Sequence, residues 1–146
     1  MNIALSSYHQ LLLVHAGCTL FLVGLIWVIQ VVHYPLFAHV GFEDYERYQE
    51  IHMQRITWIV APVMLAEVAC ALALISWPQA PNAHLTWVGF GLLIIIWLST
   101  MFLQVPAHAA LTQGWNADAH SRLVTSNWIR TIAWTSRGLL SLWLLK

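Results

Sequence analysis

Charged residues are scarce in this sequence, and their scarcity limits the class of protein. Six Lys and Arg and six Asp and Glu residues make up 8% of the chain, whereas hydrophobic residues make up 60% of it. An average soluble domain is roughly 25% charged, so a water-soluble bundle of this size would lack the charges to cover its surface. The formal net charge of zero also provides no basic field for nucleic acid, and we expect no nucleic-acid partner.

Cysteines and amino-terminal basic residues are scarce as well. The two cysteines, Cys18 and Cys70, lie inside apolar segments, where neither a disulfide framework nor a zinc knuckle is built, and we interpret both as small core residues. The first ten residues contain no Lys or Arg, and no small-residue cleavage site follows the first apolar run. We therefore expect the first helix to be retained rather than removed as a signal peptide.

The sequence does contain long apolar runs. Four stretches approach the length of about 20 mostly apolar residues that a membrane-spanning helix needs. They are residues 11–32, 56–77, 85–105 and 128–145. The first and third contain no charged residue, the second contains Glu67, and the fourth contains Arg130 and Arg137. We predict an all-α, single-domain membrane four-helix bundle with helices at about 9–33, 53–77, 85–107 and 125–145.

The connections between these stretches differ in length and charge. Residues 78–84 form a short connection with two prolines, so the second and third helices are expected to be antiparallel neighbours. Residues 33–52 and 105–127 are longer, hold most of the charged residues, and are expected at one membrane face. Their arginines favour the cytoplasmic side. We expect a multi-pass protein of the bacterial inner membrane.

An internal repeat relates the first predicted helix pair to the second. The matched residues are Gln30 with Gln104, His33 with His108, His52 with Asn127, and Arg55 with Arg130. Both histidines precede the next matched residue by 19 positions. The duplication predicts two helix-loop-helix units about a pseudo-twofold axis along the membrane normal, with the matched polar residues around that axis.

The fourth stretch carries a polar stripe, and the second carries a buried carboxylate. Asn127, Arg130, Trp134, Arg137 and Ser141 recur at steps of three and four, which places them on one helix face. Charges within a membrane normally face protein or a wet cavity, so the two deepest are candidate site residues. The residues that we expect to line a cofactor or ligand site are Gln30, Gln104, Trp134, Arg137 and Glu67.

Structural roles are the alternatives for these residues. Glu67 and Arg137 would then form a salt bridge between the second and fourth helices. Arg137 leans toward the start of its helix and could instead reach His33 or His52. Core packing is the alternative for Trp134.

Histidine is unusually frequent, with eight residues in the chain. His33, His52 and His108 come from three predicted helices at one membrane face, and imidazole is the commonest metal ligand. We expect these three to be candidate ligands for a transition metal or haem, completed by a carboxylate such as Glu50 or by water. Hydrogen bonding to loops and lipid head groups is the alternative.

The carboxyl-terminal half carries two recognisable segments. They are Gln104-Val-Pro106-Ala-His108-Ala-Ala-Leu111 and Ser126-Asn127-Trp128-Ile129-Arg130-Thr131. This half resembles the anthrone-oxygenase-like family of small four-helix membrane proteins. Pro106, Leu111, Asn127, Arg130 and Thr131 match that family, whereas His108 stands where it usually has Asn. The resemblance implies a four-helix bundle that oxidises a lipophilic aromatic compound, in a family whose characterised members look cofactor-independent.

Two classes of function follow. As an oxidoreductase or oxygenase, the protein would bind a lipophilic small molecule between the repeats, with His52, Arg55, Asn127 and Arg130 as catalytic candidates. A histidine would act as base or metal ligand, and the arginines would stabilise an oxyanion. As a non-enzyme, it would be a ligand-binding or accessory subunit of a homo-oligomer or larger membrane complex. Transport is a third possibility, which only the repeat suggests.

Overall fold

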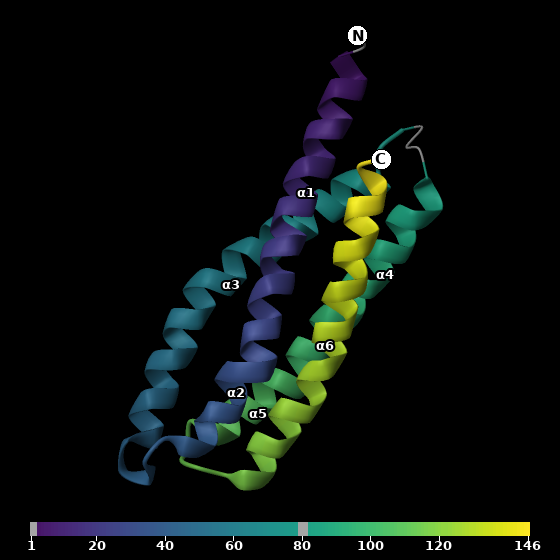
Figure 1. Cartoon of the computed structure of the whole chain (residues 1–146). Helices are drawn as coiled ribbons and strands as arrows, with labels where there is room; N and C mark the ends of the chain where they lie inside the picture. Colours follow the sequence, from purple (N-terminus) through teal and green to yellow (C-terminus); the bar gives the residue numbers. More distant parts are fainter. Residues whose placement is uncertain (1–2, 79–81) are drawn as a thin grey trace.

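The computed structural model describes residues 3–78 and 82–146, and in this part of the chain all secondary structure is helical and forms four long rods (Figure 1). The first rod comprises α1 (Ile3–Val28), the π-helical turn η1 (Ile29–His33), α2 (Tyr34–Leu36) and the 3-10 turn η2 (Phe37–His39). The second comprises the 3-10 turn η3 (Phe42–Asp44) and α3 (Tyr45–Ile75). The third comprises α4 (Ala83–Ser99), the π-helical turn η4 (Thr100–Gln104) and α5 (Val105–Leu111), and the fourth is α6 (Ala117–Leu144).

Three of these rods are long and apolar enough to cross a membrane. They are Ser6–His39, Phe42–Ile75 and Ala83–Leu111. Their length and composition make the chain a multi-pass membrane protein, as predicted. α6 has 28 residues but is not among the three, because the polar stripe with Arg130 and Arg137 lowers its mean hydropathy.

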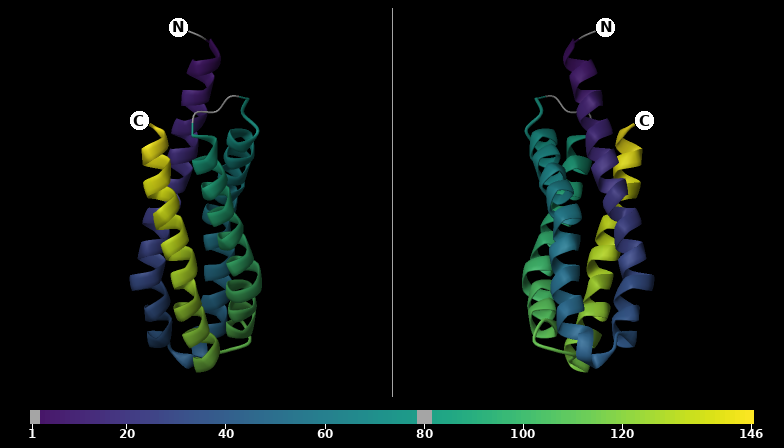
Figure 2. Two further views of the ribbon diagram at one scale, coloured as in Figure 1. Left: turned by 90° about the vertical axis from the view of Figure 1, so that its right-hand side faces the viewer. Right: turned by 90° about the vertical axis from the view of Figure 1, so that its left-hand side faces the viewer.

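The rods run up and down, with both chain ends at one end of the bundle (Figure 1). α6 packs against α1 and α4, α1 also packs against α3, and α3 packs against α4 (Figure 2). The α3–α4 pairing agrees with the predicted short connection between them, of which residues 79–81 lie outside the described part. At the described edge of this connection, Asn82 stands at the N-cap position of α4 in a left-handed conformation with φ of 60°, without a side-chain capping hydrogen bond.

The two connections at the other end are shorter than the sequence suggests. α3 begins at Tyr45 rather than near residue 53, and α6 begins at Ala117 rather than near residue 125. Hydropathy marks only the apolar part of a helix, whereas the polar turns before it are also helical here. α6 is started by Asn116, whose side-chain oxygen accepts a hydrogen bond from the Ala119 amide over 2.9 Å.

The bundle has large apolar side chains outside, and its interior contains polar side chains among the apolar ones of the core. Large hydrophobic side chains such as Phe102 and Leu139 are exposed. Buried polar side chains include His15, Gln30, Glu67, Gln104, His108, Asn127, Arg130 and Arg137. Lipid can solvate the apolar exterior, whereas a polar group in hydrocarbon must find a partner within the protein. The interior is therefore where the candidate site residues gather.

Candidate ligand-binding site

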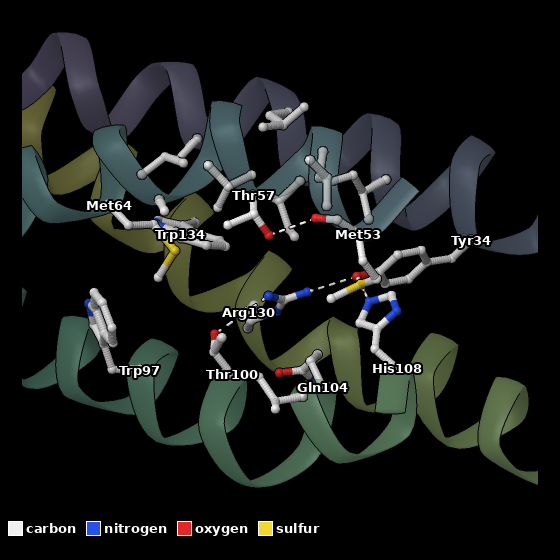
Figure 3. A pocket seen from close by; sticks show the side chains of 18 of the residues that line it. Tyr34, Met53, Thr57, Met64, Trp97, Thr100, Gln104, His108, Arg130 and Trp134 are labelled. Carbon is white, nitrogen blue, oxygen red and sulfur yellow. Dashed lines mark hydrogen bonds between the residues drawn. The ribbon is translucent and has the colours of Figure 1, made fainter. Parts of the chain in front are cut away.

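A pocket of about 350 Å³ lies inside the bundle, between α1, α3, α4 with η4, and α6 (Figure 3). Small-molecule pockets generally have volumes of about 300–1,000 Å³. Most of the lining is aliphatic or aromatic, and Met64, Trp97 and Trp134 lie toward one end of the view in Figure 3. The polar lining consists of Tyr34, Thr57, Thr100, Gln104, His108 and Arg130. A large apolar volume is thus combined with a few polar groups.

The pocket reaches the outside of the bundle between α3 and the rod formed by α4, η4 and α5. Thr57 and Leu65 of α3 line the pocket and are exposed. Val105 of α5 also lines it, with 53% of its surface exposed. These positions lie within helices that are apolar enough to cross a membrane. The opening therefore lies on the side of the bundle, within the length of these helices.

Arg130 supplies the pocket with a buried positive charge. Its side chain is 7% exposed, and its Nε donates to Asn127 Oδ1 over 2.9 Å while its Nη2 donates to the same oxygen. The Nη2 atom lies 3.3 Å from the Tyr34 hydroxyl, and Nη1 lies 3.4 Å from Thr100 Oγ1. The guanidinium carbon lies 5.9 Å from the ring centroid of Trp134, within range of a cation–π interaction.

Arg130 faces the bundle interior because it belongs to the polar stripe of α6. All five members of the predicted stripe, Asn127, Arg130, Trp134, Arg137 and Ser141, are buried. Their steps of three and four residues keep them on one face, and that face lies against α1 and α4. Asn127 and Arg130 are adjacent on it, which explains how the amide can hold the guanidinium.

His108 extends the hydrogen-bond network of Arg130 and Tyr34. Its Nε2 lies 3.0 Å from the Tyr34 hydroxyl, and its Nδ1 lies 2.8 Å from Gln49 Nε2. An amide nitrogen only donates, so Gln49 donates to Nδ1 and the proton of the neutral imidazole is on Nε2. His108 then donates to the Tyr34 oxygen, which also accepts from Arg130.

His33 and His52 lie beside this hydrogen-bond network. The three histidines predicted to form one cluster are therefore close together. His33 Nε2 lies 2.9 Å from His52 Nδ1, and the His52 and His108 ring centroids are 5.8 Å apart. Phe37 packs beside this pair, with its ring centroid 5.1 Å from those of both His33 and His52. The His52 Nε2 atom is buried and has no hydrogen-bond partner among the described residues.

These histidines do not form the expected metal site. Within residues 3–78 and 82–146, no three His, Cys, Asp or Glu side chains are arranged to hold a metal ion. Both ring nitrogens of His108 are hydrogen-bonded, and His33 and His52 point nitrogens at each other. The carboxylate suggested as a fourth ligand, Glu50, is exposed. The geometry therefore gives no support to a metal ion held by these three residues together.

Gln30 and Gln104 connect the π-helical turns to α6. Gln30 Nε2 donates to the Val124 carbonyl over 3.1 Å, and Gln30 Oε1 accepts from Asn127 Nδ2 over 2.8 Å. Gln104 Nε2 donates to Ser126 Oγ over 2.9 Å. Gln104 lines the pocket, as predicted, whereas Gln30 lies behind it and positions Asn127.

Glu67 and Arg137 form a second buried polar group. Arg137 Nε lies 3.0 Å from Glu67 Oε1, and Arg137 Nη2 lies 3.1 Å from His15 Nε2. The predicted alternative of a direct salt bridge is therefore formed, and Arg137 reaches neither His33 nor His52. Neither Glu67 nor Arg137 lines the large pocket. Trp134 belongs to both regions, since it lines the pocket and donates to Glu67 Oε2 over 3.1 Å.

The first and third rods each contain a π-helical turn followed by a proline. η1 precedes Tyr34-Pro35, and η4 precedes Val105-Pro106. Proline lacks an amide hydrogen and displaces the carbonyl of the preceding turn, which favours a widened turn before it. Alignment of the two prolines would pair Gln104 with His33, whereas the sequence repeat pairs Gln104 with Gln30. The predicted matching of Gln30 with Gln104 stays a prediction.

Arg55 is not part of the site. Its side chain is exposed, whereas that of its predicted equivalent Arg130 is buried. Arg55 shares an outward face with Trp58, Ile59 and Pro62, all of which are exposed. Met53, Ile56, Val60 and Met64 form the opposite face, which lines the pocket. The predicted role of Arg55 at a central axis is therefore wrong.

Three residues of the site were missed from the sequence. Tyr34 and Gln49 hold His108, and Thr100 contacts Arg130. Tyr34 precedes a proline and follows one of the matched histidines. This position beside the repeat is the sequence feature that could have identified Tyr34 as a site residue. Gln49 lies in a segment predicted as loop, and nothing in the sequence marks it.

Comparison of the chain with models of known families, with characterised proteins and with solved structures finds no match. The resemblance of the carboxyl-terminal half to anthrone-oxygenase-like proteins therefore stays a prediction from its motifs.

Proposed function

We propose that this multi-pass membrane protein binds a lipophilic small molecule in the pocket, with a polar group of that molecule beside Arg130, Tyr34 and His108. The observation that carries the proposal is the 350 Å³ pocket, whose lining is mostly apolar but includes a buried guanidinium. An apolar pocket with a few convergent polar groups is the usual form of a small-molecule site. Its sideways opening suits a ligand that dissolves in the bilayer.

The membrane arrangement that accompanies this proposal has four spanning rods. α6 is long enough to cross, at 28 residues, and its charged residues Arg130 and Arg137 are buried within the bundle rather than exposed to lipid. A helix can cross with such residues when they face protein. We further propose that the two helix pairs arose by duplication, with the η1 and η4 turns as equivalents, and that the protein lies in a bacterial inner membrane with the α5–α6 end in the cytoplasm.

Oxidation of the ligand is a second candidate function, favoured by the unpartnered Nε2 of His52. When the neutral His52 ring carries its proton on Nδ1 and donates it to His33, its Nε2 is free to take a proton. His52 itself does not line the pocket, but it precedes Met53, which does. Removal of a proton from an anthrone-type substrate gives an enolate, which Arg130 would stabilise. One O2 then converts the CH2 group into a carbonyl with release of one water, so no other oxidant is required.

Ligand binding is tested by extracting the purified full-length chain with organic solvent and identifying lipophilic compounds by mass spectrometry. We expect one compound class at near-stoichiometric amount in the wild type and much less in Arg130→Met. The matched control is Arg122→Met, because Arg122 is an exposed arginine on the same helix. Equal ligand content in the two variants would contradict the proposal. A ligand-free wild type would favour the accessory-subunit alternative.

The oxidation candidate is tested by oxygen uptake with a hydrophobic anthrone or phenol as substrate. We expect uptake by the wild type and by His39→Ala, and loss of uptake in His52→Ala. His39 is exposed and lies outside the pocket, which makes it a suitable control. Wild-type protein that binds such compounds without consuming oxygen would leave ligand binding as the function and remove the enzymatic one.

A further inference from the structure

The buried charge of Arg130 has no opposite charge beside it. Among the described residues the single ion pair is that of Arg137 with Glu67. Glu67 is also occupied by Thr19 and Trp134, so it is not available to Arg130. A buried charge is usually paired, because an unpaired charge removed from water loses its hydration without compensation. Of the two buried arginines, Arg137 is thus paired, whereas Arg130 has no counter-charge among the described residues.

The contacts of Arg130 leave one edge of its guanidinium weakly held. Asn127 Oδ1 accepts from Nε and Nη2, which fixes the Nε–Nη2 edge. The other contacts are to neutral hydroxyls, Thr100 at 3.4 Å from Nη1 and Tyr34 at 3.3 Å from Nη2. Both distances exceed the usual range of about 2.7–3.2 Å for an N–H···O hydrogen bond. Nη1 and Nη2 can therefore donate to an acceptor that lies closer than these two hydroxyls.

The Tyr34 hydroxyl beside this edge also offers a hydrogen rather than an acceptor. The Tyr34 oxygen accepts from Arg130 and His108, so its own hydroxyl hydrogen has no acceptor in the described part of the chain. The polar groups left open at this edge of the pocket are thus positively charged or hydrogen-donating. A ligand that complements them carries a negative charge and accepts hydrogen bonds.

We propose that the ligand of this pocket is a lipophilic carboxylic acid in its anionic form. Its carboxylate would lie across Nη1 and Nη2 of Arg130 and accept from the Tyr34 hydroxyl, and its hydrocarbon body would extend toward Met64 and Trp97. A guanidinium binds a carboxylate with two parallel hydrogen bonds, which fits a planar edge that nothing else holds closely. This inference rests on the proposed ligand-binding function and names the chemical class of the ligand.

The test compares dodecanoate with 1-dodecanol and methyl dodecanoate, which have the same hydrocarbon chain but no charge. Equilibrium binding of each radiolabelled compound is measured with the full-length protein in lipid nanodiscs at neutral pH. We expect dodecanoate to bind at least about tenfold more tightly than either neutral compound, a difference of about 1.4 kcal/mol. Because this comparison uses wild-type protein, it does not depend on the folding of any variant.

Three variants then locate the preference. Arg130→Met should bind the acid and the alcohol equally, whereas the exposed-arginine control Arg122→Met should keep the wild-type preference. Arg130→Lys should keep part of it, because an ammonium retains the charge but not the planar fork. Size-exclusion chromatography checks that each variant is folded.

The possible failures are distinguishable. Equal wild-type affinity for dodecanoate and 1-dodecanol would overturn the carboxylate inference while leaving a lipophilic ligand in place. Absence of binding for all three compounds would overturn both this inference and the proposed function. A preference for dodecanoate that Arg130→Met retains would place the anion site elsewhere in the protein and would also overturn the inference.

Discussion

Arg137 and Glu67 lie 3.0 Å apart, Nε to Oε1, and both side chains are buried. The pair connects α6 with α3, and its remaining polar atoms bind the other two rods. Thr19 of α1 donates to Glu67 Oε1 over 2.9 Å, and Arg137 donates to the Gly89 carbonyl of α4. Trp134 donates to the second carboxylate oxygen. All four rods therefore meet at one buried ion pair.

Removal of one partner of this pair should strongly destabilise the protein. Glu67→Ala leaves the Arg137 guanidinium buried without a counter-charge, and we expect a loss of about 3–5 kcal/mol in the free energy of unfolding. The double variant with Glu67→Met and Arg137→Met should recover part of this loss, because it removes both charges together. Unfolding in detergent with increasing SDS measures both effects. A double variant less stable than Glu67→Ala would contradict this account.

A side chain at Gly138 should separate α1 from α6. A Cβ atom there would lie 3.0 Å from Val23 Cγ2 and 3.5 Å from Leu20 Cδ2. We expect Gly138→Leu to lower the stability by about 1–3 kcal/mol through overpacking. Gly17→Leu is the control, because Gly17 is exposed and an added Cβ meets no atom within 4 Å. The two midpoints of thermal unfolding should differ clearly, and equal values would exclude close α1–α6 packing at Gly138.

Replacement of His108 should cost stability whether or not the protein is an enzyme. His108→Phe leaves Gln49 without a partner and removes a donor from Tyr34. Buried polar groups left unpaired cost about 1–3 kcal/mol, and we expect a decrease of that size in unfolding experiments. His39→Phe changes an exposed side chain and should stay within about 0.5 kcal/mol of the wild type. If both variants unfold alike, the hydrogen bonds of His108 do not contribute to stability.

Reporter fusions should show that α6 crosses the membrane. A reporter inserted at Gly114, between α5 and α6, should lie in the cytoplasm, and one inserted at His84 should lie on the opposite side. A reporter after Lys146 should share the compartment of the His84 reporter. A carboxyl-terminal reporter in the same compartment as Gly114 would mean that α6 does not cross, and reporters at His84 and Gly114 in one compartment would contradict the spanning of α4 and α5.

Much of the architecture was predictable because it depends on local properties of the sequence. Apolar runs of sufficient length predicted the spanning helices, and three of them meet the criterion in the structure. The spacing of polar residues predicted the buried face of α6, because helical periodicity is fixed by the backbone alone. Helix starts at Tyr45 and Ala117 were not predicted, because hydropathy does not distinguish a polar helical turn from a loop.

The candidate site was predictable only in part, since matched sequence positions need not be matched in space. Arg55 and Arg130 occupy matched positions in the predicted repeat, yet one faces outward and the other lines the pocket. Their difference depends on how α3 and α6 are rotated against their neighbours. That rotation is decided by packing between helices, which no single segment of sequence contains.

The sequence by itself determined that this chain places its helices in a membrane and which face of α6 is polar. Only the tertiary structure decided that Arg137 pairs with Glu67, that His108 is held by Tyr34 and Gln49, and that Arg130 faces a pocket without a carboxylate. Hydropathy and helical period act within a segment of some tens of residues. A contact between two side chains depends on the rotation and axial shift of two helices, and small changes in either exchange one hydrogen-bond partner for another.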